Sequence, residues 1–159
     1  MTRHTGHENS KHLTEGQLPA RPLPGIHLVR VEVLATAKPL EQLFGPHDVA
    51  DFVRTRIGKL DRECFAVLHL NAKHSVLSME VVSIGALQSA LVHPREVFKG
   101  AILANAAAIL CAHNHPSGDL TPSPEDVAIQ KRLTLSGELL GIPVLDFLIV
   151  TAERHVSMT

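Results

Sequence analysis

The pattern of apolar and polar residues predicts helices and strands along most of the chain. Apolar residues at helical spacing predict three helices, and short apolar or alternating runs predict strands. The helices are expected at 46–60, 94–105 and 124–140, and the strands at 64–70, 75–84, 87–92, 106–112, 144–150 and 155–158. This order predicts an α/β fold of the α+β kind, in which a mixed sheet is flanked by helices on both faces.

Each predicted helix carries apolar residues on one face, so each is expected to cover the sheet. The inward-facing residues are expected to be Val49, Phe52, Val53 and Ile57 in the first helix, Val97, Phe98, Ala101 and Ile102 in the second, and Ile129, Leu133 and Leu140 in the third. The run 106–112 is apolar at every position, which is typical of a strand covered on both faces. Gly141 and Pro143 are expected to end the third helix.

The N-terminal part of the sequence differs in composition from the rest. Residues 1–25 are polar, with Gly, Pro and scattered charges, and indicate a flexible tail. Apolar and polar residues alternate within 26–34, so 26–38 is interpreted as an arm or linker strand, and 39–159 as the folded domain. The arm could pair with the sheet edge of another chain, which leaves a homo-oligomer open.

Composition narrows the classes of partner and compartment. The 159 residues carry a net charge of −1, with five Phe and no Trp or Tyr, so neither a basic field nor stacking aromatics support direct nucleic-acid binding. The N-terminal residues lack the apolar core of a signal peptide, and no run has the length of a membrane span. Cys64 and Cys111 lie in apolar runs, as buried thiols do. We expect a cytoplasmic protein without membrane contact.

The polar segment after the apolar run 106–112 carries the candidate chemistry. His113 and His115 are two residues apart, so on an extended backbone their side chains leave on the same face. Ser123, Pro124 and the two acids that follow have the sequence of a helix start, which directs Asp126 towards the histidines. Two imidazoles and one carboxylate form a three-ligand zinc set with a fourth position for water.

The spacing H-x-H-x7-S-x2-D between His113 and Asp126 resembles the JAMM motif of MPN metalloprotease-like domains. The surrounding segments resemble the RadC branch of that superfamily: VHPREV at 92–97, NAAA at 105–108, HNHPSG at 113–118 and TPSPED at 121–126. The resemblance covers roughly 40–157 and implies a three-layer architecture like that of cytidine deaminases. The helical region that precedes this domain in longer RadC proteins is missing, so the chain resembles the short stand-alone forms.

The resemblance implies a zinc ion held by His113, His115 and Asp126, with Glu63 as the general base because the JAMM glutamate stands at the start of a strand. Glu80, in the next strand, is the rival, which strand alternation could place outside the site. For Ser123, two roles stay open: a pure helix cap, or a second role near the substrate or the water.

These residues lead to one main functional hypothesis and two alternatives. The main hypothesis is a zinc-dependent hydrolase of peptide or isopeptide bonds, acting on a peptide or protein substrate that the sequence does not identify. The alternatives are a non-catalytic MPN-type binding module and a DNA repair or recombination accessory protein of the RadC type. A zinc deaminase is disfavoured, because the H-x-E and P-C-x-x-C signatures are absent.

Overall fold

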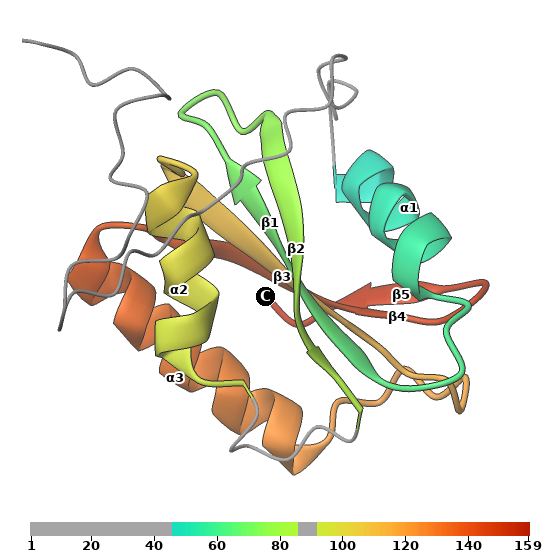
Figure 1. Cartoon of the computed structure of the whole chain (residues 1–159). Coiled ribbons are helices and arrows are strands. Elements are labelled where there is room, and N and C mark those ends of the chain that lie inside the picture. The colour runs from blue at the N-terminus through green and yellow to red at the C-terminus, as the bar shows by residue number, and fades with distance from the viewer. Residues whose placement is uncertain (1–45, 86–91) are drawn as a thin grey trace, which may run out of the picture. The chain divides into compact units, whose positions relative to one another are not determined.

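A computed structural model describes residues 46–85 and 92–159 (Figure 1). Its elements are α1 (Pro46–Ile57), β1 (Cys64–Leu70), β2 (Val76–Ile84), α2 (Pro94–Leu103), β3 (Ala108–Asn114), α3 (Pro124–Leu140), β4 (Val144–Val150) and β5 (His155–Ser157). The tail expected at 1–25, the arm at 26–38, and the strand at 87–92 up to residue 91 lie outside the described residues. No helix in the two described ranges is long and apolar enough to cross a membrane.

The five strands form one mixed sheet in the order β2-β1-β3-β4-β5. The β3–β4 pair is parallel, and the other three pairs are antiparallel. The all-apolar run is the central strand, β3, which has a neighbour on each side and is buried along its whole length. The strand begins two residues later than expected and extends through His113 to Asn114, so the sheet itself carries the first candidate ligand.

Helices cover both faces of the sheet, which confirms the predicted fold class (Figure 1). Alternate strand residues divide between two cores. One core packs α1 residues such as Val53 against Ala66, Leu110 and Leu148. The other packs α2 and α3 residues such as Phe98 and Leu133 against the intervening strand positions, among them Val67, Cys111 and Phe147. The α2–α3 face is the one on which the odd-numbered residues of β3 lie.

Two apolar residues expected to face inward are instead exposed. Ile102 is 55% exposed, because it lies about 140° around the helix from Val97 at 100° per residue. Leu140 is 47% exposed. The buried side of α3 ends at Gly137, where an added Cβ would lie 2.5 Å from the carbonyl oxygen of Ile142. At Gly141 the chain then turns back with a positive φ of 70°, as the predicted glycine cap requires.

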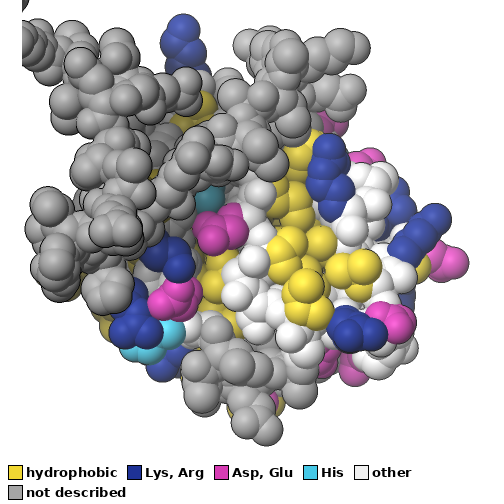
Figure 2. Space-filling model, in the orientation of Figure 1, with side chains coloured by type: hydrophobic (Ala, Val, Ile, Leu, Met, Phe, Trp, Pro, Cys, Tyr) yellow, Lys and Arg dark blue, Asp and Glu magenta, His cyan; other side chains and the backbone are white. Residues whose placement is uncertain are grey.

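The outer strand β2 leaves part of one sheet edge apolar and exposed. Leu77, Val81 and Ile84 are 43%, 46% and 62% exposed. Figure 2 shows apolar side chains gathered together on the face turned towards the viewer. An edge strand also presents unpaired backbone groups. The homo-oligomer considered from the sequence stays a prediction, since no second chain tests it.

Two leucines of α3 provide a test of the packing of the fold. Leu133 is fully buried against the sheet, whereas Leu135 on the same helix is 67% exposed. We expect Leu133→Ala to lower the free energy of unfolding in urea by about 2–5 kcal/mol, through lost burial and a residual cavity. Leu135→Ala, with the same change in side chain, is expected to stay within about 0.5 kcal/mol. Equal losses in both variants would contradict the orientation of α3.

Candidate metal centre

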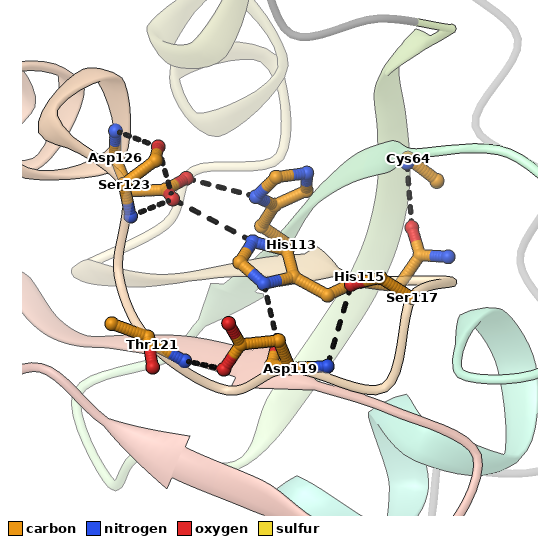
Figure 3. A network of polar contacts seen from close by, with 9 residues as sticks. Cys64, His113, His115, Ser117, Asp119, Thr121, Ser123 and Asp126 are labelled. Atoms are coloured by element: carbon orange, nitrogen blue, oxygen red, sulfur yellow. Dashed lines mark hydrogen bonds and ion pairs between the residues drawn. The ribbon is translucent and has the colours of Figure 1, made fainter.

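Three potential metal ligands meet where β3 ends and α3 begins (Figure 3). His113 lies near the end of β3, His115 follows that strand directly, and Asp126 lies in the first turn of α3. Each offers one ligand atom, and these atoms lie within 4.8 Å of one another. Residues on either side of the nine-residue connection 115–123, together with His115 at its start, thus form a single cluster.

The cluster is largely shielded from solvent. His113 is 2% exposed and Asp126 is 1% exposed, while the side chain of His115 is 11% exposed. His113 lies opposite Phe65 of β1 and beside Ile149 of β4, so apolar strand residues flank its backbone. Burial of polar groups in such surroundings requires partners.

The Asp126 carboxylate is held by a capping box at the start of α3. The Ser123 hydroxyl accepts a hydrogen bond from the Asp126 N–H at 3.1 Å and donates one to Oδ2 at 2.6 Å, and the Ser123 N–H donates to the same oxygen at 2.8 Å. Burial alone would raise the pKa of Asp126, but the hydrogen bonds from His113 and Ser123 outweigh it and hold that pKa well below its usual range. The helix start therefore fixes an ionised carboxylate.

The loop after β3 fixes the ring of His115. His115 Nδ1 lies 2.6 Å from the carbonyl oxygen of Asp119. Because a carbonyl only accepts, Nδ1 carries the proton, and the lone pair of the neutral ring is on Nε2. Nε2 lies 3.5 Å from Asp126 Oδ2. A ligand histidine is commonly oriented in this way, by a hydrogen bond from its other ring nitrogen.

His113 provides an independent sign that a ligand belongs here. Its Nδ1 lies 2.9 Å from Asp126 Oδ1, while its Nε2 is a buried nitrogen without a hydrogen-bond partner. Its ring centroid is 4.7 Å from that of His115, with the ring planes at 82°. A buried polar atom without a partner is costly. The donor set and this orphaned nitrogen both fit a bound metal ion.

The two candidate bases lie in different surroundings. Glu63 directly precedes β1 and is half-buried. Phe65 pairs with His113 at the end of the antiparallel ladder, so Glu63, two residues before Phe65, lies at the end of β1 that is nearest to the cluster.

Glu80 pairs with Val67, whose partner in β3 is Cys111. It shares the face of the cluster, so strand alternation does not exclude it. Its carboxylate instead lies under α2, 3.9 Å from His69 Nε2, and an added Cβ on Gly100 would lie within 3.0 Å of its carboxyl carbon. Burial raises the pKa of Glu80, opposed by nearby Lys99. Position along the strands, rather than alternation, separates Glu80 from the cluster.

The cysteines have the surroundings expected of buried thiols. Cys64 and Cys111 are free, with exposed fractions of 1% and 0%. Burial raises the pKa of both, which disfavours a reactive thiolate. Cys111 packs in the core on the α2–α3 face and is not part of the three-residue cluster.

A pocket of roughly 480 Å³ adjoins the cluster at His115. Three segments surround it: the α1–β1 connection at 58–61, the loop after β3, and the β4–β5 turn at 151–154. Arg154 donates a hydrogen bond to the carbonyl oxygen of Gly118 at 3.1 Å, which ties the β4–β5 turn to the loop after β3. Sequence reasoning did not identify this pocket, because segments far apart in the chain form it.

Sequence reasoning also gave no role to Asn114, between the two histidines. Its side chain is completely buried and bonds the backbone at the start of β1. A polar amide at the end of a buried, largely apolar strand is the signal that could have singled it out.

The fold and the site together define a mixed α/β domain with a candidate His-His-Asp metal centre at the end of its central strand. The family model described as RadC-like JAB domain matches residues 43–159, and the chain belongs to this family.

Related proteins are similar over most of the chain. A UPF0758 protein of Moorella thermoacetica is 51% identical over 113 residues, which cover 71% of this chain and 49% of that protein. One from Desulfitobacterium hafniense is 41% identical over 159 residues, covering 99% of this chain and 70% of that protein. A UPF0758 protein of Caldanaerobacter subterraneus is 43% identical over 133 residues, which cover 84% of this chain and 57% of that protein. The chain thus spans about half to two thirds of the length of these relatives.

The cap at Ser123 can be tested by comparing this serine with Ser136, which lies within α3. Ser123→Ala removes the hydroxyl that caps the helix and bonds Asp126, so we expect the metal-free protein to lose about 1 kcal/mol of unfolding free energy. Ser136→Ala removes an exposed hydroxyl that bonds Arg132 O within the helix and is expected to stay within about 0.5 kcal/mol. Urea unfolding measures both, and a neutral Ser123→Ala would contradict the capping role.

Proposed function

We propose that this chain is a zinc-dependent hydrolase of peptide or isopeptide bonds. The observation that carries the proposal is the buried cluster of His113, His115 and Asp126, whose ligand atoms lie within 4.8 Å of one another. Two imidazoles and a carboxylate are a zinc-type set that leaves a coordination position open. Membership of the RadC-like JAB family supports the same chemistry.

The residues around the cluster fit a hydrolytic site. A bound zinc ion would polarise a carbonyl group and lower the pKa of a water molecule to near 7. Asp119 and Ser123 hold His115 and Asp126 through the hydrogen bonds already described. Such supporting bonds keep ligands oriented and raise the affinity for the metal. The chain therefore supplies both ligands and their supports.

In this proposal, Glu63 moves the proton. Its carboxylate takes a proton from the attacking water and gives it to the leaving amine, as a general base and then a general acid. The register of β1 on β3 supports this role, because Phe65, two residues after Glu63, pairs with His113. Ser123 remains a helix cap here, since both its hydroxyl contacts go to Asp126.

The pocket beside His115 is the proposed position of one side of the substrate. Its lining includes both cations and anions, among them Lys59, Asp61, Glu153 and Arg154. This mixture favours a polar peptide segment over a uniformly charged polymer, since a nucleic-acid groove carries an excess of basic side chains.

Metal content tests the ligand set. We expect the purified wild-type chain, dialysed against zinc, to retain about one zinc ion per chain, as a single three-ligand site requires. His113→Ala and Asp126→Ala should lose most of it, whereas Glu63→Gln should retain it, because Glu63 is not a ligand in this proposal. Elemental analysis gives the stoichiometry, and His74→Ala, a hairpin histidine outside the cluster, is the matched control. Equal zinc in all five proteins would refute the site.

Hydrolysis tests the mechanism. A library of peptides and isopeptide-linked peptides is incubated with zinc-loaded protein, and products are identified by mass spectrometry. We expect cleavage by the wild type and a loss of about 10²–10⁴-fold in Glu63→Gln, the usual contribution of a general base. Glu80→Gln is the matched control and should retain activity. Undiminished cleavage by Glu63→Gln would remove the proposed mechanism, and zinc binding without cleavage of any peptide would favour a non-catalytic module.

A further inference from the structure

The Asn114 side chain links the end of β3 to the start of β1. Asn114 is completely buried. Its Oδ1 accepts a hydrogen bond from the Cys64 N–H at 2.5 Å, and its Nδ2 donates one to the carbonyl oxygen of Arg62 at 3.1 Å. Both partners are backbone groups, and they belong to the residues on either side of Glu63. One amide therefore holds the chain immediately before and immediately after the proposed base.

These two side-chain hydrogen bonds join β1 and β3 beyond the last pair of their backbone ladder. The register between β1 and β3 ends at the pair Phe65–His113. Past that point the backbone of His115 turns to β4, where its N–H donates to Val150 O at 2.9 Å. The amide of Asn114 spans the gap that this leaves towards β1. On the other side, Gly85 N–H donates to Glu63 O at 2.8 Å, so the segment is held from both neighbours.

Successive side chains of β3 point to opposite faces of the sheet. The end of the strand can therefore carry a candidate metal ligand on one face and the Asn114 amide on the other. Odd-numbered residues such as Cys111 pack on the α2–α3 side and even-numbered residues such as Ala112 on the α1 side. His113 and Asn114 therefore face opposite sides. The amide can therefore bond the neighbouring backbone without entering the metal cluster. A shorter side chain could not donate to Arg62 O and accept from Cys64 N at the same time.

We propose that Asn114 is a positioning residue, whose amide holds the backbone around Glu63 so that the Glu63 carboxylate faces the metal centre. This inference rests on the proposed function, since it gives Asn114 its role through Glu63. A residue that merely stabilised the sheet would affect the unfolding free energy and leave the behaviour of the centre unchanged. The two roles can therefore be separated by a spectroscopic measurement on the folded protein.

The test uses the full chain loaded with Co²⁺, whose visible absorption reports the geometry around the metal. The absorption is recorded against pH for wild type, Glu63→Gln, Asn114→Ala and the double variant. We expect Glu63→Gln to shift the midpoint of the spectral change by about one pH unit, as loss of a neighbouring charge does. Asn114→Ala should shift it in the same direction, and the double variant should match Glu63→Gln alone, because residues that act through one another are not additive.

Asn71 offers a matched control at the other end of β1. Its side chain also bonds two backbone N–H groups, those of Lys73 and Ser75, at 2.9 and 3.0 Å. Asn71→Ala should leave the spectral midpoint unchanged. If Asn114→Ala fails to fold, Asn114→Ser takes its place, and hydrogen exchange of the wild-type protein gives a second measurement: the Cys64 amide should exchange as slowly as the ladder amides of β1.

The outcomes separate this inference from the proposed function. A Glu63→Gln shift without any shift in the Asn114 variants, or a rapidly exchanging Cys64 amide, overturns the role of Asn114 and leaves the zinc site standing. Additive shifts in the double variant also overturn it. A wild-type chain that binds neither Co²⁺ nor zinc overturns the proposed function, and the role of Asn114 with it.

Discussion

The interaction on which the candidate site depends is the set of three hydrogen bonds between Ser123 and Asp126 at the start of α3. A helix begins with N–H groups that need acceptors, and Ser123 supplies one. Asp126, the third residue of the helix, bonds back to the cap through one carboxylate oxygen and contacts His113 through the other. A local requirement of helix geometry therefore fixes a candidate ligand, so the helix cap and the candidate metal centre are parts of one arrangement.

The second constraint is the central place of β3 in the sheet. A strand with neighbours on both sides cannot shift without breaking both ladders, and a slip of one residue would send every side chain to the opposite face. His113 and His115 are therefore held on the α2–α3 face, where the start of α3 also lies. The charge on Asp126 is kept in a buried place by hydrogen bonds that lower its pKa, which is what a ligand carboxylate requires.

Much of this could be read from the sequence, and the failures have physical causes. The strand 64–70 and the helix 124–140 were predicted with the bounds observed, because a largely apolar run marks the strand, and a Ser-Pro start and a glycine end mark the helix. Ile102 was misplaced because it lies about 140° around the helix from Val97, beyond the buried face, and Leu140 because periodicity gives a helix face but not where its buried contact ends. The surroundings of Glu80 depend on the close approach of Gly100 in α2, which no local pattern encodes. The pocket beside His115 needs three segments that meet only in the folded chain.

The tripeptide 113–115 combines two roles in adjacent residues: the histidines are candidate metal ligands, and Asn114 bonds the backbone at the start of β1. Its outer residues direct imidazoles to one face, and its middle residue directs an amide to the other. The two histidines lie close to Asp126 at the start of α3. The Asn114 amide bonds Cys64, fifty residues earlier in the chain. Because β3 is rigid and central, these distant segments take their positions from the same backbone. The start of β1 and the candidate ligands at the end of β3 therefore keep a fixed relation to each other, which the sheet and the hydrogen bonds of Asn114 set.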